Sequence, residues 1–443
     1  MSTLAVFWYE RIHFIRNPFK VVALLLFAAA GIYGLHNGAA LYDSQLAEIE
    51  NIKIKTEERI QETLAFYEEG KKGPEARPWV DVSQPFWALR FATPTHYYKQ
   101  PSAAMVYSIG QAEQYGFYKQ VSAWSSPYDA DMAEEIANPE RLQAGVLDFS
   151  FVIWYLLPLL LLIMLYNIKG AEAEAGFLLL IYAQTGAKTS WLLARVSFYV
   201  ALLGLTLLSL MVYGALLNGV FSSVAAVFAP ISLYLLLYLL LWAAAYFFIL
   251  QTGTSSVVNT MKMAGSWLLV AFILPALVHQ WVSIAYPTNL MTEWVDAQRN
   301  GRQRIYELPD SVLQANLEEL FPAIADSPLR QDPDRIGYAR SRSYSALSNE
   351  LMKSISVPIE QQNEDRNALI RSTYWLNPIA FFQNRVNSLT ATHFQDYKGY
   401  RTNIQGLVDQ QVSVLMQELW KGEKVDKEKY LEYHKQFRQE HYQ

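Results

Sequence analysis

The side chains that could carry chemistry are few, and their spacing builds no catalytic centre. The chain has no cysteine, which excludes disulfides, thiolate metal sites and cysteine nucleophiles. Its seven histidines form no His-x-x-x-His pair and no H-E-x-x-H motif, the spacings that place two zinc ligands on one helix face. We therefore assign no catalytic residue and expect neither a metal site nor a cofactor held by this chain.

The segment from Gln184 to Thr189 has the Lys-Thr ending of a phosphate-binding loop. Such a loop needs glycine at two fixed positions, so that backbone amides can cradle the phosphates. Tyr182 and Ala187 occupy those positions here. The chain is therefore not expected to bind ATP through this motif.

Two other features have both a functional and a structural interpretation. Four acidic residues between 129 and 135 could bind calcium, but a solvated acidic helix start after Pro127 also explains them. His279 lies in an apolar run, where an ionisable side chain is a functional candidate. Its neighbours Gln280 and Trp281 favour simple placement at a membrane interface.

The elements that would position any site are dominated by apolar runs. Between Val196 and Met261 the chain has 66 residues without Asp, Glu, Lys or Arg. A bilayer core takes roughly 20 apolar residues per helix. Asn218-Gly219 interrupts this stretch and Pro230 starts its second half, so it predicts two membrane spans.

Three more runs bring the prediction to five spans with aromatic residues near most ends. The expected order is a helix along the membrane surface at 1–20, spans at 21–42 and 149–166, a loop at 167–190, and spans at 191–217, 230–250 and 263–286. Two large regions, 43–148 and 287–443, remain outside the spans. The fold class is thus an α-helical polytopic membrane protein with two large, mainly helical regions outside the bilayer.

Basic residues in the short segments predict the orientation. The segments before the first span, between the second and third and between the fourth and fifth, counted together with Arg195 near the start of the third span, contain seven basic and three acidic residues. This leaves 29 basic and 38 acidic residues elsewhere. We expect these segments and the N-terminus in the cytoplasm, the C-terminus outside, and residues 21–42 to be a retained anchor. The net charge of −5 averages two compartments and gives no reason to expect nucleic acid as a partner.

The two regions outside the spans differ in character. Apolar residues spaced through 46–64 predict that the first span continues as a helical stalk, ended by the Gly- and Pro-rich segment 70–78. Residues 79–128 are rich in aromatic side chains, for which a packed core and a ligand groove are the two interpretations. Region 287–443 is predicted to be helical with breaks at its prolines, and its apolar run 374–382 is too short to span a bilayer.

The loop at 167–190 is longer than a turn between two spans requires. Two acids, Glu172 and Glu174, precede a short apolar run that begins at Phe177, a pattern suited to a short helix along the cytoplasmic face. The segment from Gln184 to Lys188 is expected to form the turn into the third span.

This loop resembles that of the permease subunits of type 2 ABC exporters, which carry E-x-E-x-G-T-L followed by leucines. Glu172, Glu174, Gly176 and Leu178 match, whereas Phe177 replaces the usual threonine. Thr185-Gly186 replaces the more common proline-containing turn. In that family the loop is the coupling helix that docks into the ATPase subunit.

The resemblance extends to other segments. One branch of these permeases has a large insert between its first two spans, and its sequence around the second span is similar to Asp148–Val152 and Leu157–Leu160 here. The second outside segment of that branch resembles Asn377–Gln383 together with Asn387–Phe394. Leu4–Phe19 resembles the elbow helix that opens such permeases, an extension of the first span being the alternative. A sixth span is usual in the family, and none is predicted after Tyr286: either the chain has five spans or the sequence stops before the sixth.

The resemblance implies a membrane subunit in the bacterial inner membrane, paired with itself or a second permease, whose partner ATPase binds ATP and Mg. The residues expected to couple the two subunits are Glu172, Glu174, Gly176, Phe177, Leu178, Gln184, Thr185 and Lys188. The first alternative is a mechanotransmitter that moves envelope proteins without passing a solute. The second is a membrane-anchored scaffold or an enzyme with its site outside. The substrate is left open.

Overall fold

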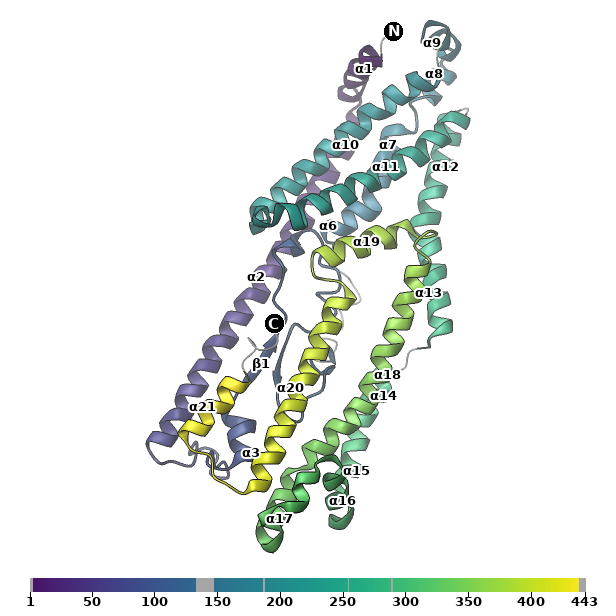
Figure 1. Ribbon diagram of the computed structural model, residues 1–443. Helices are drawn as coiled ribbons and strands as arrows, with labels where there is room; N and C mark the ends of the chain where they lie inside the picture. The colour runs from purple at the N-terminus through teal and green to yellow at the C-terminus, as the bar shows by residue number, and fades with distance from the viewer. Residues whose placement is uncertain (1–2, 133–146, 186–187, 254, 288–289, 438–443) are drawn as a thin grey trace.

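The computed structural model describes residues 3–132, 147–185, 188–253, 255–287 and 290–437 (Figure 1). Five helical elements are long and apolar enough to cross a membrane. The first is α2 (Pro18–Glu68), and the second joins α6 (Phe149–Phe151), η3 (Val152–Leu156) and α7 (Leu157–Leu165). The others are α10 (Lys188–Asn218), α11 (Ala229–Thr252) and the continuous α12 (Ser256–Leu268), η6 (Leu269–Ile273) and α13 (Leu274–Ala285).

The bundle surface carries large apolar side chains that water would not tolerate over such an area. Leu205, Leu216 and Phe248 are each about two-thirds exposed, and the fifth helix exposes residues along most of its length. Contiguous apolar surface of this extent is the lipid-facing surface of membrane helices. The chain is therefore a helical, multi-pass membrane protein.

Inside the bundle, side chains donate to two backbone carbonyls just before Pro158. Pro158 has no N–H, so the carbonyl of Trp154, four residues earlier, lacks its helical donor. The Tyr238 hydroxyl donates to that carbonyl at 2.6 Å, and the Trp267 indole N–H donates to the carbonyl of Tyr155 at 3.0 Å. A lipid environment supplies no water to do this, so the fourth and fifth helices are fixed against the second.

Helix bounds differ from the predicted spans where polar residues continue a helix. α2 is 51 residues long, because the stalk predicted from the spacing of apolar residues continues the first helix without a break. The fifth helix begins at Ser256, seven residues before the expected start, because Ser255 caps it by accepting the N–H of Val258. Lys262 is consequently inside a helix, and the connection from the fourth helix is shorter than predicted.

The N-terminal segment is a separate helix, α1 (Thr3–Ile15), and not an extension of the first span. Asn17 caps α2 by accepting the N–H of Lys20, and this cap breaks the helical run. α1 packs against α10 with Val6 and Phe14, while Trp8 and Ile15, which belong to a set of apolar residues at helical spacing, are more than half exposed. These exposed apolar residues suit a helix lying in a membrane surface.

The two regions outside the bundle fold together into what we call the distal domain, residues 43–132 and 290–437. One apolar core contains side chains from both, including Phe86, Leu313 and Ile404. Figure 1 shows this domain at the opposite end of α2 from α1, α8 and α9. Two short antiparallel strands, which were not predicted, belong to it: β1 (Thr95–Tyr98) and β2 (Tyr118–Val121).

The other regular elements of the distal domain are helices. Its elements in the first region are α3 (Pro85–Trp87), η1 (Ala88–Ala92) and η2 (Ala103–Val106). In the second region they are α14 (Leu290–Asp296), η7 (Ala297–Gly301), α15 (Arg302–Tyr306), α16 (Asp310–Leu320), η8 (Pro322–Asp326), η9 (Pro328–Gln331), α17 (Pro333–Arg342), α18 (Tyr344–Ser372), α19 (Pro378–Leu389), α20 (Phe394–Lys421) and α21 (Lys427–Gln436). Pro358 lies inside α18, so the predicted break there is wrong, whereas Pro322, Pro328, Pro333 and Pro378 start helices.

Candidate functional site

The loop that resembles a coupling helix folds as two short helices joined by a tight turn. α8 (Gly170–Glu174) is followed by Ala175 and then by Gly176, whose φ of +78° is left-handed and suits glycine. The N–H of Gly176 donates to the carbonyl of Ala173, and the N–H of Phe177 donates to that of Glu172, the paired bonds of a Schellman motif. α9 (Leu178–Thr185) then follows.

Glu172 belongs to a charged network between three helices. The Arg195 guanidinium, on α10, donates to Glu172 on α8 at 3.1 Å and to Glu10 on α1 at 2.6 Å. It also donates to the carbonyl of Ile168, at the end of the second membrane helix, at 2.8 Å. Glu10 is only 2% exposed, so its carboxylate depends on these partners.

The same network reaches the long helix α2. The Tyr199 hydroxyl donates to Glu10 at 2.8 Å, and Lys20 Nζ donates to the Tyr199 oxygen at 3.1 Å and to the carbonyl of Met164 at 2.7 Å. α1, α2, α7, α8 and α10 are therefore tied together at one end of the bundle. We call Glu10, Lys20, Glu172, Arg195 and Tyr199 the charged network.

Glu174, the second acid of the loop, connects α8 to the fifth membrane helix. Its Oε1 accepts the backbone N–H of Ser256 at 2.7 Å, one of the amides that the first turn of α12 leaves unpaired. The positive end of the helix dipole favours a carboxylate at this position. Glu172 and Glu174 thus fix α8 to two different membrane helices.

Gly170 permits this contact between α8 and α12. A Cβ at position 170 would lie 2.3 Å from the Ser256 nitrogen, a distance that real atoms do not adopt. Gly170→Ala is therefore expected to push α12 away from α8 and to lower the free energy of unfolding by about 1–3 kcal/mol. Thermal unfolding in detergent would measure this. Gly265→Ala, whose added methyl meets nothing, is the control, and equal melting temperatures for the two variants would contradict the predicted clash.

α9 presents apolar side chains outward at the same end. Leu179 is 79% exposed, and Phe177 and Leu180 are more than half exposed, whereas Leu178 packs partly against the bundle core. Gln184 is exposed within α9, so the predicted turn starts later than expected: α9 continues to Thr185 and α10 starts at Lys188. The predicted site residues therefore lie on α8, on the turn after it, on α9 and, for Lys188, at the start of α10. Glu172 and Glu174 are the members held by contacts to membrane helices.

Sequence reasoning missed Glu10, Lys20, Arg195 and Tyr199 as members of this site. Arg195 was used only as an indicator of orientation, although an arginine near the end of an apolar span has to be paired. Glu10 lies four residues after Val6 and four before Phe14, so one turn spacing places it on the buried face of α1. These two signals indicate that each residue needs a buried partner, although they do not say which residue that partner is.

A second buried charge cluster lies in the distal domain. Asp131 is 3% exposed, contrary to the predicted solvated helix start; it accepts the N–H of Gly116 at 3.1 Å and a bond from Arg401 at 3.3 Å. Arg401 also pairs with Glu360, which accepts the Tyr128 hydroxyl at 2.8 Å. Arg401 follows Asp131 by 270 residues, so no local pattern indicates the pair. Glu134 and Glu135 lie outside the described residues.

Burial raises the pKa of Asp131 from 3.8 to about 7, more than Arg401 lowers it. A carboxyl whose pKa is higher in the folded state contributes stability below its unfolded pKa and loses that contribution as pH rises towards 7. The melting temperature of the wild type is therefore expected to fall between pH 5 and pH 7.5 relative to that of Asp131→Asn. Thermal unfolding at several pH values measures this difference, and parallel curves for the two proteins would contradict it.

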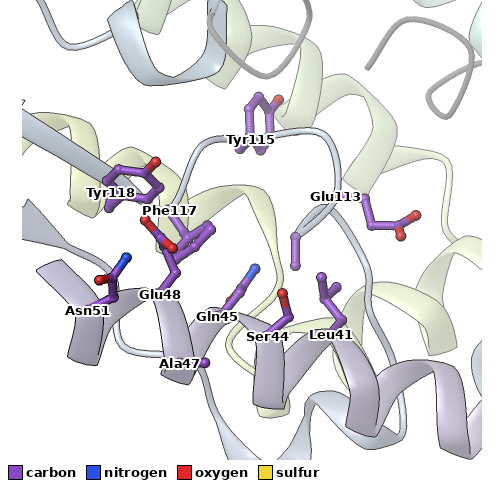
Figure 2. A pocket seen from close by; sticks show the side chains of 11 residues that line it. Leu41, Ser44, Gln45, Ala47, Glu48, Asn51, Glu113, Tyr115, Phe117 and Tyr118 are labelled. Carbon is purple, nitrogen blue, oxygen red and sulfur yellow. The ribbon is translucent and has the colours of Figure 1, made fainter. Parts of the chain in front are cut away.

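The aromatic residues of 79–128 form mainly core, and some of them line cavities at its edge. Phe86, Tyr97 and Tyr107 are buried. A cavity of about 560 Å³ separates α2 from residues 112–118 (Figure 2). Ser44, Gln45, Glu48 and Asn51 line it from α2, and Glu113, Tyr115, Phe117 and Tyr118 line it from the facing segment.

No other constellation supports catalysis in the residues that the structure describes. Among them, no group of three or more His, Asp and Glu side chains could hold a metal ion. His279 is exposed on α13. Comparison with protein-family models, with curated proteins and with solved structures gave no match for this chain.

Proposed function

We propose that this protein is the membrane subunit of an ATP-driven exporter or extractor, and that α8 and α9 receive the motion of a partner ATPase in the cytoplasm. The observation that carries the proposal is the attachment of one short surface element to two membrane helices, through Glu172 to α10 and through Glu174 to α12. A force on the exposed apolar residues of α9 would reach both helices directly. Tight packing transmits such displacements.

The orientation proposed from the sequence agrees with this role. The charged network and Glu174 contain all three acidic residues of the segments expected in the cytoplasm. Glu10 and Glu172 pair with Arg195, and Glu174 accepts the N–H of Ser256. These contacts stabilise one end of the bundle, which would keep α8 rigid during a cycle. The protein would act as a homodimer or a heterodimer with a second permease, in the bacterial inner membrane.

A mechanotransmitting subunit that passes no solute is the second candidate, and one observation favours it. α2 continues for 51 residues from the charged network into the core of the distal domain, a length of about 75 Å. A tilt of α2 at Lys20 would therefore move the distal domain. In this form the subunit would use ATP hydrolysis in the cytoplasm to act on an envelope protein outside.

Affinity purification of the detergent-solubilised chain from its host, followed by mass spectrometry and an ATPase assay, tests the proposal. We expect recovery of an ABC ATPase with vanadate-sensitive activity, and any second permease recovered would identify a heterodimer. Loss of that ATPase from a Glu174→Ala preparation that retains its melting temperature would support coupling through α8. Recovery of no ATPase under conditions that preserve other membrane complexes would contradict the proposal.

A further inference from the structure

A cavity of about 290 Å³ lies where α18, α19 and the start of α20 meet, far from α8 and α9. We call it the arginine cavity. Its lining includes Arg371, Tyr374, Asn384, Arg385, His393 and Asp396. Tyr374 is the first residue of the apolar run 374–382, and it is the member of that run that lines the cavity.

One wall of the cavity is α19, which packs against the membrane bundle near the start of the second membrane helix and beside the middle of the fifth. α19 packs against α11 and η6, and Phe382 on α19 contacts the rings of Trp154 and Tyr238 in the bundle core. Figure 1 shows α19 below α6, with its first residues beside the junction of α12 and α13 within the fifth membrane helix. Phe272 and Ile273 at that junction are nearly half exposed, as lipid-facing residues are.

Trp375, between α18 and α19, is 80% exposed, and Leu376 beside it is also exposed. Full exposure to water would be costly for a tryptophan. Tryptophan is enriched at the boundary between lipid tails and headgroups, where its ring is buried and its N–H remains hydrated. The position of Trp375 therefore indicates contact with the bilayer surface.

The arginines of the cavity are available to an anion. Within the part of the chain that the structure describes, neither Arg371 nor Arg385 forms an ion pair, and Arg385 only stacks over the Phe381 ring at 5.6 Å. The one carboxylate of the lining, Asp396, already accepts the N–H of His393 at 2.9 Å in the cap of α20. Asn384 donates to the Tyr374 hydroxyl oxygen at 2.8 Å. Because the hydroxyl accepts this bond, its own proton can be donated to another group.

We propose that the arginine cavity binds the phosphate headgroup of a membrane phospholipid, with Trp375 and Leu376 inserted beside its acyl chains. Arg371 and Arg385 would hold the phosphate oxygens, since guanidinium groups match phosphate geometry. The bound lipid would fix the distal domain to the bilayer at the turn between α18 and α19. The proposal requires that the helices of the bundle span a membrane. It does not require that a partner ATPase binds.

Native mass spectrometry of the full-length chain, with added phosphatidylglycerol, tests the arginines. We expect Arg371→Gln with Arg385→Gln to bind the tightest lipid at least about tenfold more weakly than the wild type. Arg299→Gln with Arg304→Gln removes the same charge from an exposed part of the distal domain and should leave that affinity unchanged. Equal affinity in all three proteins, or displacement of the lipid by millimolar inorganic phosphate, would overturn the assignment.

A spin label tests Trp375 even where the arginine variants fail to fold. Because the chain has no cysteine, Trp375→Cys and the control Trp79→Cys each give one labelling site. In nanodiscs, a label at 375 should be reached by oxygen and protected from a polar nickel reagent. The label at 79, in a distal-domain position that is 63% exposed, should show the reverse. Equal access of the nickel reagent to both labels would overturn the proposed insertion.

Discussion

Arg195→Met is expected to lower the free energy of unfolding by about 3–5 kcal/mol, the largest effect of any single substitution in the bundle. The variant leaves Glu10 buried without its guanidinium partner, and a buried carboxylate without a counter-charge is strongly destabilising. It also removes the donor to Ile168. Thermal or denaturant unfolding in detergent measures the change, and limited proteolysis would detect release of α1.

A double-mutant cycle separates the ion pair from general packing. Adding Glu10→Gln to Arg195→Met removes the unpaired charge, so the double variant should be more stable than Arg195→Met alone. Glu172→Gln should cost less than Glu10→Gln, because the Glu172 side chain is 25% exposed whereas that of Glu10 is 2% exposed. Additive effects of the two substitutions would show that Glu10 and Arg195 do not stabilise each other.

Leu179→Glu is expected to weaken association with the partner ATPase at least about tenfold and to remove its stimulation by the membrane subunit. A charge placed in the apolar centre of an interface costs more than the 1.4 kcal/mol that corresponds to a tenfold change. Leu179 is 79% exposed, so the melting temperature of the isolated subunit should not change. Copurification and ATPase assays in proteoliposomes provide the measurement.

Val357→Glu is the matched control for this prediction. Val357 is an exposed aliphatic residue on α18 in the distal domain, so the same charge is introduced away from α9. We expect ATPase binding to stay at the wild-type value in this variant. Equal loss of binding in both variants would indicate a general effect of charge, and retention of binding in Leu179→Glu would remove α9 from the interface.

The sequence predicted the membrane helices well because their signal is local. A bilayer needs an uninterrupted apolar run, and each of the five runs corresponds to one helical element in the structure. The stalk was predictable for the same reason, since the apolar spacing after Tyr42 continues that of the first helix. Helix ends were less predictable: Ser255 starts a helix by capping it, although polar residues also occur in loops.

The contacts of the candidate site were not predictable from single segments. Glu10 and Arg195 are 185 residues apart, and Asp131 and Arg401 are 270 apart, so only the packing of the whole chain pairs them. The association of the two outside regions into one distal domain has the same origin, because their shared core forms from residues distant in sequence. Glu172 and Glu174 were recognised by their pattern, but their partners on α10 and α12 came from the fold.

A single-cysteine crosslink at position 179 tests the central proposal most directly. Leu179→Cys in this cysteine-free chain gives one reactive site on α9. In inverted membrane vesicles, where the cytoplasmic side is accessible, we expect a bifunctional maleimide reagent to join this site to an ABC ATPase, with an adduct whose yield changes with ATP and vanadate. Labelling of the introduced thiol by an impermeant maleimide from outside intact cells, or no ATPase adduct in the vesicles, would contradict a coupling role for α8 and α9.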